Sequence, residues 1–240
     1  MLERLDYVKL APRCILDAGS GPAREAGALA ARYRGAAVIA ADFSLAMLRL
    51  AKPRWLARLL GRGPACVCAD LAHLPLADGA VDLAWCNMAL HWAGEPLAVL
   101  KELQRVLAPE GLLMLSTLGP DTLRELRAAA GAERVHRFHD MHDIGDMLVA
   151  AGFAAPVMDM EMLTFTYANA DALLADLRAS GQTSARADRT RGLAGKAFAA
   201  RLRAALAPRA SYEVVYGHAW KAAPRASEEA KTVRVFKRLP

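Results

Sequence analysis

The sequence has few aromatic residues, few cysteines and no long apolar run. Only 6% of its 240 residues are aromatic, and only four are cysteines. No apolar stretch approaches the roughly 20 residues of a membrane-spanning helix. The charged start Met1–Asp6 does not resemble a secretion signal, and the chain holds no internal repeats or low-complexity tracts. With 55% hydrophobic and 23% charged residues, the composition predicts one globular domain over residues 1–240, without a membrane partner.

Residues that could bind a metal are also scarce. The four cysteines all lie in segments expected to be strands: Cys14, Cys66, Cys68 and Cys86. We interpret them as small buried residues of a cytoplasmic protein, because disulfides are rare in a reducing compartment. Cys66-x-Cys68 has no second pair to complete a zinc site. His136, His139 and His142 recur every third residue, which drifts around a helix, so we expect helix-entrance and packing roles and no metal.

A short glycine loop follows the first apolar strand, in Leu16-Asp17-Ala18-Gly19-Ser20-Gly21-Pro22. Gly19 and Gly21 have no Cβ, so the backbone can turn tightly and a ligand can approach it closely. A dinucleotide or phosphate loop would need a further glycine or a lysine–serine pair. Arg24 stands at the glycine position, and no such pair follows. Because Asp17 would repel a pyrophosphate and attract a cation, the loop favours S-adenosylmethionine, which carries an ammonium and a sulfonium group.

Acidic residues close three successive apolar strands. Asp17, Asp42 and Asp70 are spaced by about one strand-helix-strand unit each. Because the carboxyl ends of parallel strands meet at one edge of a sheet, these carboxylates should face one ligand. Asp42 is placed to accept hydrogen bonds from ribose hydroxyls, and Asp70 from an adenine amino group. Each acid alone could be a helix cap or a turn residue, but the ordered set favours a nucleoside site.

The alternation of strands and helices predicts the fold class. Strands are expected at 14–17, 37–42, 65–69, 81–87 and 111–117, and helices at 2–10, 23–33, 44–60, 95–107, 120–130 and 143–151. This order predicts an α/β, Rossmann-like, doubly wound parallel sheet. Two later strands, 157–167 and 212–220, would form a hairpin, but a helical stretch of about 40 residues separates them, far more than a hairpin loop needs. We expect this insertion, residues 168–210, to act as a substrate cap.

Residues 13–117, with the D-x-G-x-G pattern of Asp17, Gly19 and Gly21, resemble the class I S-adenosylmethionine-dependent methyltransferases. The resemblance implies a seven-stranded sheet with a cofactor-binding core over 13–117. It also implies further cofactor contacts close to the acidic residues and at the end of the fourth strand: Phe43, Met47, Leu71 and Asn87. Ala23 occupies the position of the motif's last glycine.

Two groups of residues are candidates for the chemistry. His91 and Trp92 follow the fourth strand after Asn87, so they should border the cofactor's methyl group. His91 could be a general base, or it could only shape the pocket. Arg124 and Arg127 share one face of an expected helix. Their guanidinium groups could bind a carboxylate through paired hydrogen bonds, or they could form exposed ion pairs with neighbouring acids.

Four segments later in the sequence make the resemblance more specific. GPDTLRELR (119–127), FHDMHDIGD (138–146), PVMDME (156–161) and YEVVYGHAW (212–220) are similar to the malonyl-acyl-carrier-protein O-methyltransferases of biotin synthesis. This resemblance implies methylation of the free carboxylate of a malonyl thioester. A carboxylate needs no general base, so alignment and exclusion of water would supply catalysis. Two alternatives stay open: a methyltransferase of quinones or other small molecules, and a cofactor-binding assembly factor or hydroxylase on the same fold.

The positive charge is unevenly distributed. The net charge is +6, and residues 172–209 hold eight basic and two acidic side chains. This segment could be a solvated helix surface or a docking face for an acidic acyl carrier protein. Few aromatic residues interleave with the charges, which argues against nucleic acid. We expect a monomer.

Few residues precede the first strand. Only Met1–Pro12 come before Arg13, and they leave little chain for a lid over the cofactor. Since efficient transfer needs the methyl group to be covered, we expect cofactor binding with slow turnover.

Overall fold

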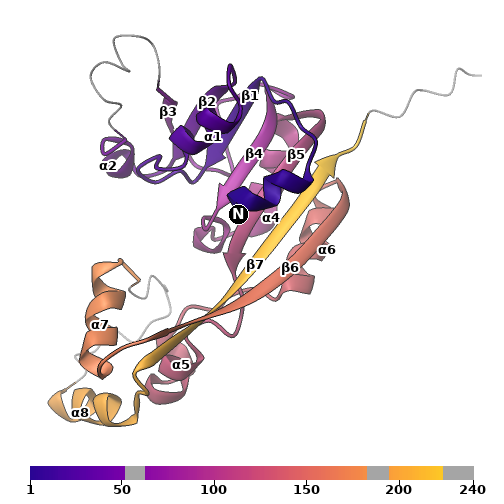
Figure 1. Ribbon diagram of the computed structural model, residues 1–240. Helices are drawn as coiled ribbons and strands as arrows, with labels where there is room; N and C mark the ends of the chain where they lie inside the picture. Colours follow the sequence, from indigo (N-terminus) through magenta and orange to yellow (C-terminus); the bar gives the residue numbers. More distant parts are fainter. Residues whose placement is uncertain (52–62, 183–194, 224–240) are drawn as a thin grey trace, which may run out of the picture.

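A single mixed sheet organises the molecule. The computed structural model describes residues 1–51, 63–182 and 195–223. They form a seven-stranded sheet in the order β3-β2-β1-β4-β5-β7-β6 (Figure 1). The strands are β1 Cys14–Ala18, β2 Ala37–Asp42, β3 Ala65–Cys68, β4 Val81–Asn87, β5 Leu107–Leu118, β6 Phe153–Thr166 and β7 Arg209–Lys221. Strands β1 to β5 pair in parallel, and β7 runs antiparallel to both β5 and β6. The predicted seven-stranded doubly wound fold is confirmed.

Helices cover both faces of the sheet. The α-helices are α1 Ala26–Arg32, α2 Leu45–Leu48, α4 Pro96–Val106, α5 Arg124–Ala130, α6 Met141–Ala150, α7 Ala170–Ala179 and α8 Lys196–Ala205. The short 3-10 helices are η1 Leu2–Tyr7, η2 Leu90–Trp92 and η3 Ala132–Arg134. Within the residues that the structure describes, no helix has both the length and the apolar character needed to cross a membrane.

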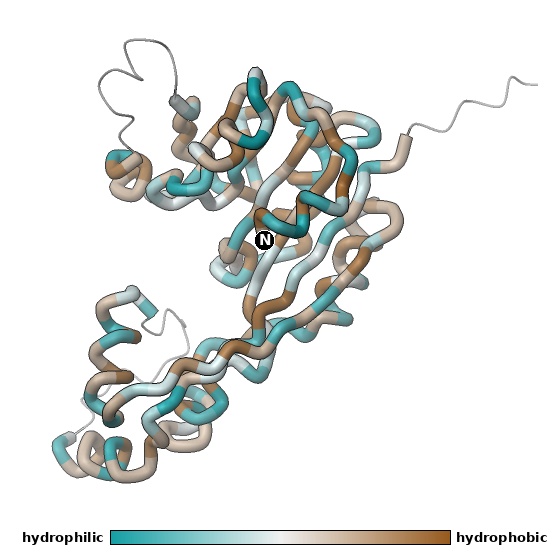
Figure 2. Tube along the Cα trace, in the orientation of Figure 1, coloured by the Kyte–Doolittle hydropathy of each residue, from teal (hydrophilic) through white to brown (hydrophobic). Residues whose placement is uncertain are grey.

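Alternation along β4 divides the core into two layers. Ala84 and Cys86 pack with α4 and α6, whereas Leu83 and Trp85 pack with η1 and α1 on the opposite face. Figure 2 shows the hydrophobic colour concentrated along the central strands. Because successive side chains point to opposite faces, β4 and β5 can contribute to a different cavity on each face of the sheet.

The helical insertion lies between β6 and β7, as predicted. Strand β5 pairs with β7 as far as Leu118 and Val214, so residues 209–213 of β7 pair with β6 alone. This two-stranded extension leads away from the sheet to α7 and α8 (Figure 1). A separate apolar cluster, which includes Leu123, Leu173 and Leu206, fixes the insertion to the segment after β5. Arg186, Arg189 and Arg191, part of the predicted basic surface, lie outside the described residues.

Several predicted helix boundaries are wrong. The helix expected from Pro120 begins only at Arg124, because Leu123 has a left-handed φ of 55° and residues 119–122 form a turn bound to β7. The first helix is a 3-10 helix that ends at Tyr7, and α1 begins at Ala26. Strand β5 already begins at Leu107. Helix α2 covers Leu45–Leu48, and most of the rest of its predicted range lies outside the described residues.

The predicted burial of the cysteines is only partly correct. Cys86 is buried in β4, but Cys66 and Cys68 are exposed. Their strand β3 lies at the edge of the sheet, where no other described strand pairs with its outer side.

Candidate active site

The glycine loop is held tightly between β1 and β2. The backbone N–H groups of Gly19 and Ser20 donate to the carbonyl oxygen of Ala41, at 2.8 and 3.0 Å. Gly19 has a φ of +74°, and a Cβ there would lie 2.2 Å from the Cβ of Ala89. Gly21 has a φ of +53° but opens onto free space. Gly19 is therefore required by both conformation and space, whereas Gly21 leaves room beside the loop.

Asp42 supports the loop from the end of β2. Its Oδ2 accepts the N–H of Gly21 at 2.7 Å, and its Oδ1 accepts the N–H of Ser44 at the same distance. Each carboxylate oxygen has a second lone pair for a further donor. The carboxylate is thus fixed in orientation at the carboxyl end of the sheet.

Asp17 is the most unusual acid of the site. It is 3% exposed, and its Oδ2 atom is buried without a hydrogen-bond partner in the described structure. Burial, with the nearby Glu25 and Asp42 carboxylates, raises the pKa of Asp17 to about 7. An unpaired buried carboxylate surrounded by other acids is unfavourable unless a cation or a donor approaches it. This geometry fits a positively charged ligand.

Glu25 is a site residue that the sequence did not reveal. The indole N–H of Trp85 and the side-chain N–H of Asn87 donate to its two carboxylate oxygens. The hydroxyl of Ser116 donates to Oδ1 of Asn87, and its oxygen accepts the N–H of Met88 at 3.1 Å. This network joins the start of α1 to the ends of β4 and β5. Glu25 follows the glycine loop closely, but its partners lie about 60 residues away.

A cavity of about 510 Å³ opens at this network. Glu25, Asn87, Met88 and Ser116 line one side of it, and Met1 with the start of η1 (Leu2 and Glu3) lies at its wall. Met88 holds a left-handed φ of 53° here. The cavity lies at the carboxyl ends of β4 and β5, where an open α/β sheet binds its ligands.

The other predicted cofactor residues lie around the loop. Asp70 is exposed, and its Oδ1 accepts the N–H of Ala72 at 2.9 Å. Phe43 and Met47 are exposed apolar side chains after β2. Leu71 is partly buried, with its Cδ1 only 3.6 Å from the position of a Cβ on Gly19. These residues border the same edge of the sheet, and their role stays a prediction.

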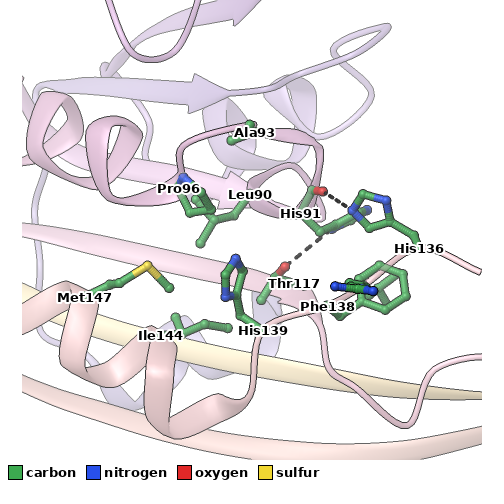
Figure 3. A pocket seen from close by; sticks show the side chains of 13 residues that line it. Leu90, His91, Ala93, Pro96, Thr117, His136, Phe138, His139, Ile144 and Met147 are labelled. Atoms are coloured by element: carbon green, nitrogen blue, oxygen red, sulfur yellow. Dashed lines mark hydrogen bonds between the residues drawn. The ribbon is translucent and has the colours of Figure 1, made fainter. Parts of the chain in front are cut away.

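His91 lies in a second cavity, on the opposite face of the sheet. This cavity of about 220 Å³ is enclosed by η2, the end of β5 and α6 (Figure 3). Nδ1 of His91 is 3.4 Å from the Thr117 hydroxyl, and Nε2 of His136 is 3.1 Å from the His91 carbonyl oxygen. Burial, with His136 nearby, lowers the pKa of His91 to about 4. His91 is therefore neutral near pH 7, and the structure does not bring it to the Glu25–Asn87 network. Trp92 is exposed beside its ring.

The three spaced histidines do not converge. His136 and His139 line the second cavity, whereas His142 is exposed and contacts Asp140, the N-cap of α6. Among the described residues, no group of three potential ligands could hold a metal ion. The helix-entrance interpretation holds for His142.

The two predicted substrate arginines differ in their surroundings. Arg127 donates to the carbonyl oxygens of Pro120 and Thr122, at 2.6 and 3.3 Å, and so holds the turn after β5. Arg124 is exposed, and its Nε lies 3.7 Å from the Glu125 carboxylate. Of the two, Arg124 has the guanidinium that a substrate could reach more easily, but neither arginine is among the residues that line the cavity at Asn87, and their role stays a prediction.

Comparisons with known proteins agree with this architecture. Residues 16–115 match the family model described as a methyltransferase domain. The chain is 50% identical to the malonyl-[acyl-carrier protein] O-methyltransferase of Gallionella capsiferriformans, over 97% of this chain and 85% of that protein. It is 49% identical to the protein of the same name from Laribacter hongkongensis, over 94% and 81%. The crystal structure of the Bacillus subtilis YcgJ protein superposes with a TM-score of 0.67 at 17% identity, covering 93% of this chain and 97% of that one.

Proposed function

The chain belongs to the malonyl-[acyl-carrier protein] O-methyltransferases, and we propose that it methylates the free carboxylate of a malonyl thioester carried by an acyl carrier protein. It is an S-adenosylmethionine-dependent methyltransferase. The observation that carries the proposal is the extent of the likeness: 50% identity runs over 97% of the chain and so includes the insertion and the last strand. The named relatives favour this reading over the quinone and assembly-factor alternatives.

The residues at the carboxyl edge of the sheet fit S-adenosylmethionine. Asp17 offers an unpaired buried carboxylate oxygen to a cationic ligand, and Gly19 leaves no side chain in the loop. We assign Asp42 to the ribose hydroxyls and Asp70 to the adenine. The remaining contacts would come from the loop, its apolar neighbours and the end of β4: Gly21, Phe43, Met47, Leu71 and Asn87. When bound, the cofactor supplies an electrophilic methyl group on a cationic sulfur.

The chain's own residues would align the substrate and exclude water. A malonyl carboxylate is already an anion near neutral pH, so no side chain has to remove a proton from it. The position of His91 in the second cavity, away from Asn87 and Met88, supports a reaction that needs no general base. The Glu25 network holds Asn87 and Met88 in one geometry at the cavity wall, which supports alignment. Arg124 is our candidate for binding the substrate carboxylate, and Arg127 would stabilise the turn that precedes Arg124.

The insertion would bind the carrier protein. Its described helices expose Arg178 on α7, and Lys196, Arg201 and Arg203 on α8. Acyl carrier proteins are acidic, so this surface is complementary to them in charge. We also propose that the enzyme acts as a monomer in the cytoplasm, a reducing compartment with which its four free cysteines agree.

The direct test is methyl transfer from labelled S-adenosylmethionine to malonyl-acyl-carrier protein, with malonyl-CoA as the comparison. The proposal expects transfer to the carrier-bound substrate at a higher kcat/KM than to malonyl-CoA. Transfer to neither malonyl thioester, by a protein that binds the cofactor, would reject the proposed substrate. Equal kcat/KM values for the two thioesters would reject the role of the carrier protein.

A further inference from the structure

Two cavities join along one face of the β6–β7 extension. The first is the cavity at Asn87 described above, and the second, of about 290 Å³, lies between the extension and α7. Met88, Leu163 and Val214 line both of them. Together they form one groove, the insertion groove, which runs from the carboxyl ends of β4 and β5 to the helical insertion.

The floor of the insertion groove is apolar. Leu163 pairs with Tyr212 across the two strands, and Phe165 and Val214 lie on the same face two residues further along each strand. Leu163 is 36% exposed and Phe165 is 53% exposed, although both are large hydrophobic residues. Brown segments alternate with white and teal ones along β6 and β7 where they leave the sheet (Figure 2). An apolar surface of this kind gains stability when a ligand covers it.

The outer end of the groove carries polar groups. The Tyr167 hydroxyl donates to Asp176 at 2.7 Å, and the Tyr212 hydroxyl donates to Gln182 at 3.2 Å. Ser180, at the end of α7, lines the same cavity. Side chains with donors and acceptors beside apolar walls can bind a chain that contains both methylene and amide groups.

The groove is long enough for an extended ligand. Tyr216 lines its inner end and Tyr212 its outer part, and the two residues are four positions apart along β7. At about 3.4 Å per residue this is a span of about 14 Å. A long narrow groove that ends at the reaction site suits a linear flexible arm.

We infer that the insertion groove binds the linear, amide-containing arm on which an acyl carrier protein bears its thioester. The inference rests on the proposed function. Its inner end reaches Asn87 and Met88, where the malonyl group would react. Its outer end lies on α7, and α7 and α8 expose the basic residues Arg178 and Arg201, which would attract the phosphate of the arm and the acidic carrier.

Blocking the groove tests this inference. Ser180→Trp would fill the outer cavity from α7, and Leu163→Trp would fill the point where the two cavities meet. Met160→Trp is the matched control, because Met160 is exposed on the other face of β6. The substrates are malonyl-acyl-carrier protein and a malonyl methyl thioester, which has no arm. Thermal unfolding and cofactor affinity are measured for each variant.

The blocking variants should lower kcat/KM for malonyl-acyl-carrier protein about tenfold more than for the short thioester. Met160→Trp should not change the ratio of the two values. An unchanged ratio in both folded blocking variants would overturn the inference. A wild type inert toward both substrates would instead reject the proposed function. Binding of the unacylated carrier would then test the groove: weaker binding to Ser180→Trp than to Met160→Trp supports it, and equal binding overturns it.

Discussion

At the scale of single residues, Asp42 offers the simplest test of the cofactor site. Asp42→Ala should weaken S-adenosylmethionine binding by about 1–3 kcal/mol, because it removes a charged acceptor from the ligand and frees the loop. Calorimetry measures the affinity. Asp82→Ala is the control, since Asp82 also accepts two backbone N–H groups, from Arg13 and Cys14, but near the amino end of β4. Equal loss of affinity in both variants would contradict a direct contact between Asp42 and the cofactor.

The raised pKa of Asp17 predicts a pH dependence of stability. The pKa is about 7 in the folded protein, against an ordinary value of 3.8, so the folded state binds the proton more tightly. The free energy of unfolding therefore falls as the pH rises from about 4 through about 7. Asp17→Asn should remove this fall. The difference between the Tm of the ligand-free variant and that of the wild type should therefore increase from pH 5 to pH 8.

The same substitution should weaken cofactor binding, because the ionised carboxylate is lost. The wild type is measured beside the variant at each pH, which cancels contributions from other groups. A difference in Tm between the two proteins that stays constant with pH would show that Asp17 does not titrate in this range.

Residues differ in how well the sequence predicts their place. Asp17 and Asp42 close apolar strands, and parallel strands bring such residues to one edge, so their positions could be predicted. Glu25 could not, because its partners Trp85 and Asn87 are far away in sequence and only the folded sheet brings them close. His91 shows a second limit. The sequence puts it near Asn87, but side-chain direction places it in a cavity on the other face.

At the scale of elements, the turn after β5 depends on Gly119. A Cβ at this position would lie 2.3 Å from the carboxyl carbon of Glu213, whose Oε2 accepts the N–H of Asp121 at 2.8 Å. Gly119→Ala should therefore destabilise the protein by about 1–3 kcal/mol in thermal or denaturant unfolding. Gly27→Ala is the control, since nothing lies within 4 Å of a Cβ there, and α-helical alanine should add about 0.5–1 kcal/mol. Equal stability of the two variants would contradict this packing.

The basic insertion predicts a salt-sensitive reaction. Arg178→Glu with Arg201→Glu should lower kcat/KM for malonyl-acyl-carrier protein, and the wild-type rate should fall as ionic strength rises. Lys9→Glu with Arg34→Glu makes the same change of charge near the amino ends of β1 and β2 and should have a smaller effect. The segment with Arg189 and Arg191 offers a further pair outside the described residues. If the rate changes neither with the insertion charges nor with the salt concentration, the basic surface does not attract the carrier protein.

Strands were easier to predict than helix starts for a physical reason. The apolar runs of β1, β2 and β4 are buried in the sheet, so hydrophobicity alone marks them. The start of α5 depends on residues far away in the sequence, because Glu213 and Ser211 of β7 bind the turn that precedes it. Pro120 is therefore held in a turn, although proline also suits a first helical turn.

At the scale of the whole molecule, the sheet separates two kinds of cavity. The groove with Asn87 and Met88 continues to the insertion, whereas the cavity with His91 lies between η2 and α6. Methylation of a carboxylate in the first cavity needs no side chain to act as a base, so it is compatible with the position of His91 in the other cavity. A substrate that had to lose a proton would need a base at that end of the groove.

Whether the transferred methyl group forms an ester therefore tests the account most directly. The protein is incubated with labelled S-adenosylmethionine and malonyl-acyl-carrier protein, and the labelled product is treated with mild alkali. A methyl ester hydrolyses under these conditions, so the account predicts that the label leaves as methanol and that the intact carrier has gained one methyl group before treatment. Alkali also cleaves the thioester, so the readout is volatility: label that stays non-volatile after alkali, as an N-methyl group on the carrier or as methylmalonate released from it, contradicts carboxyl methylation.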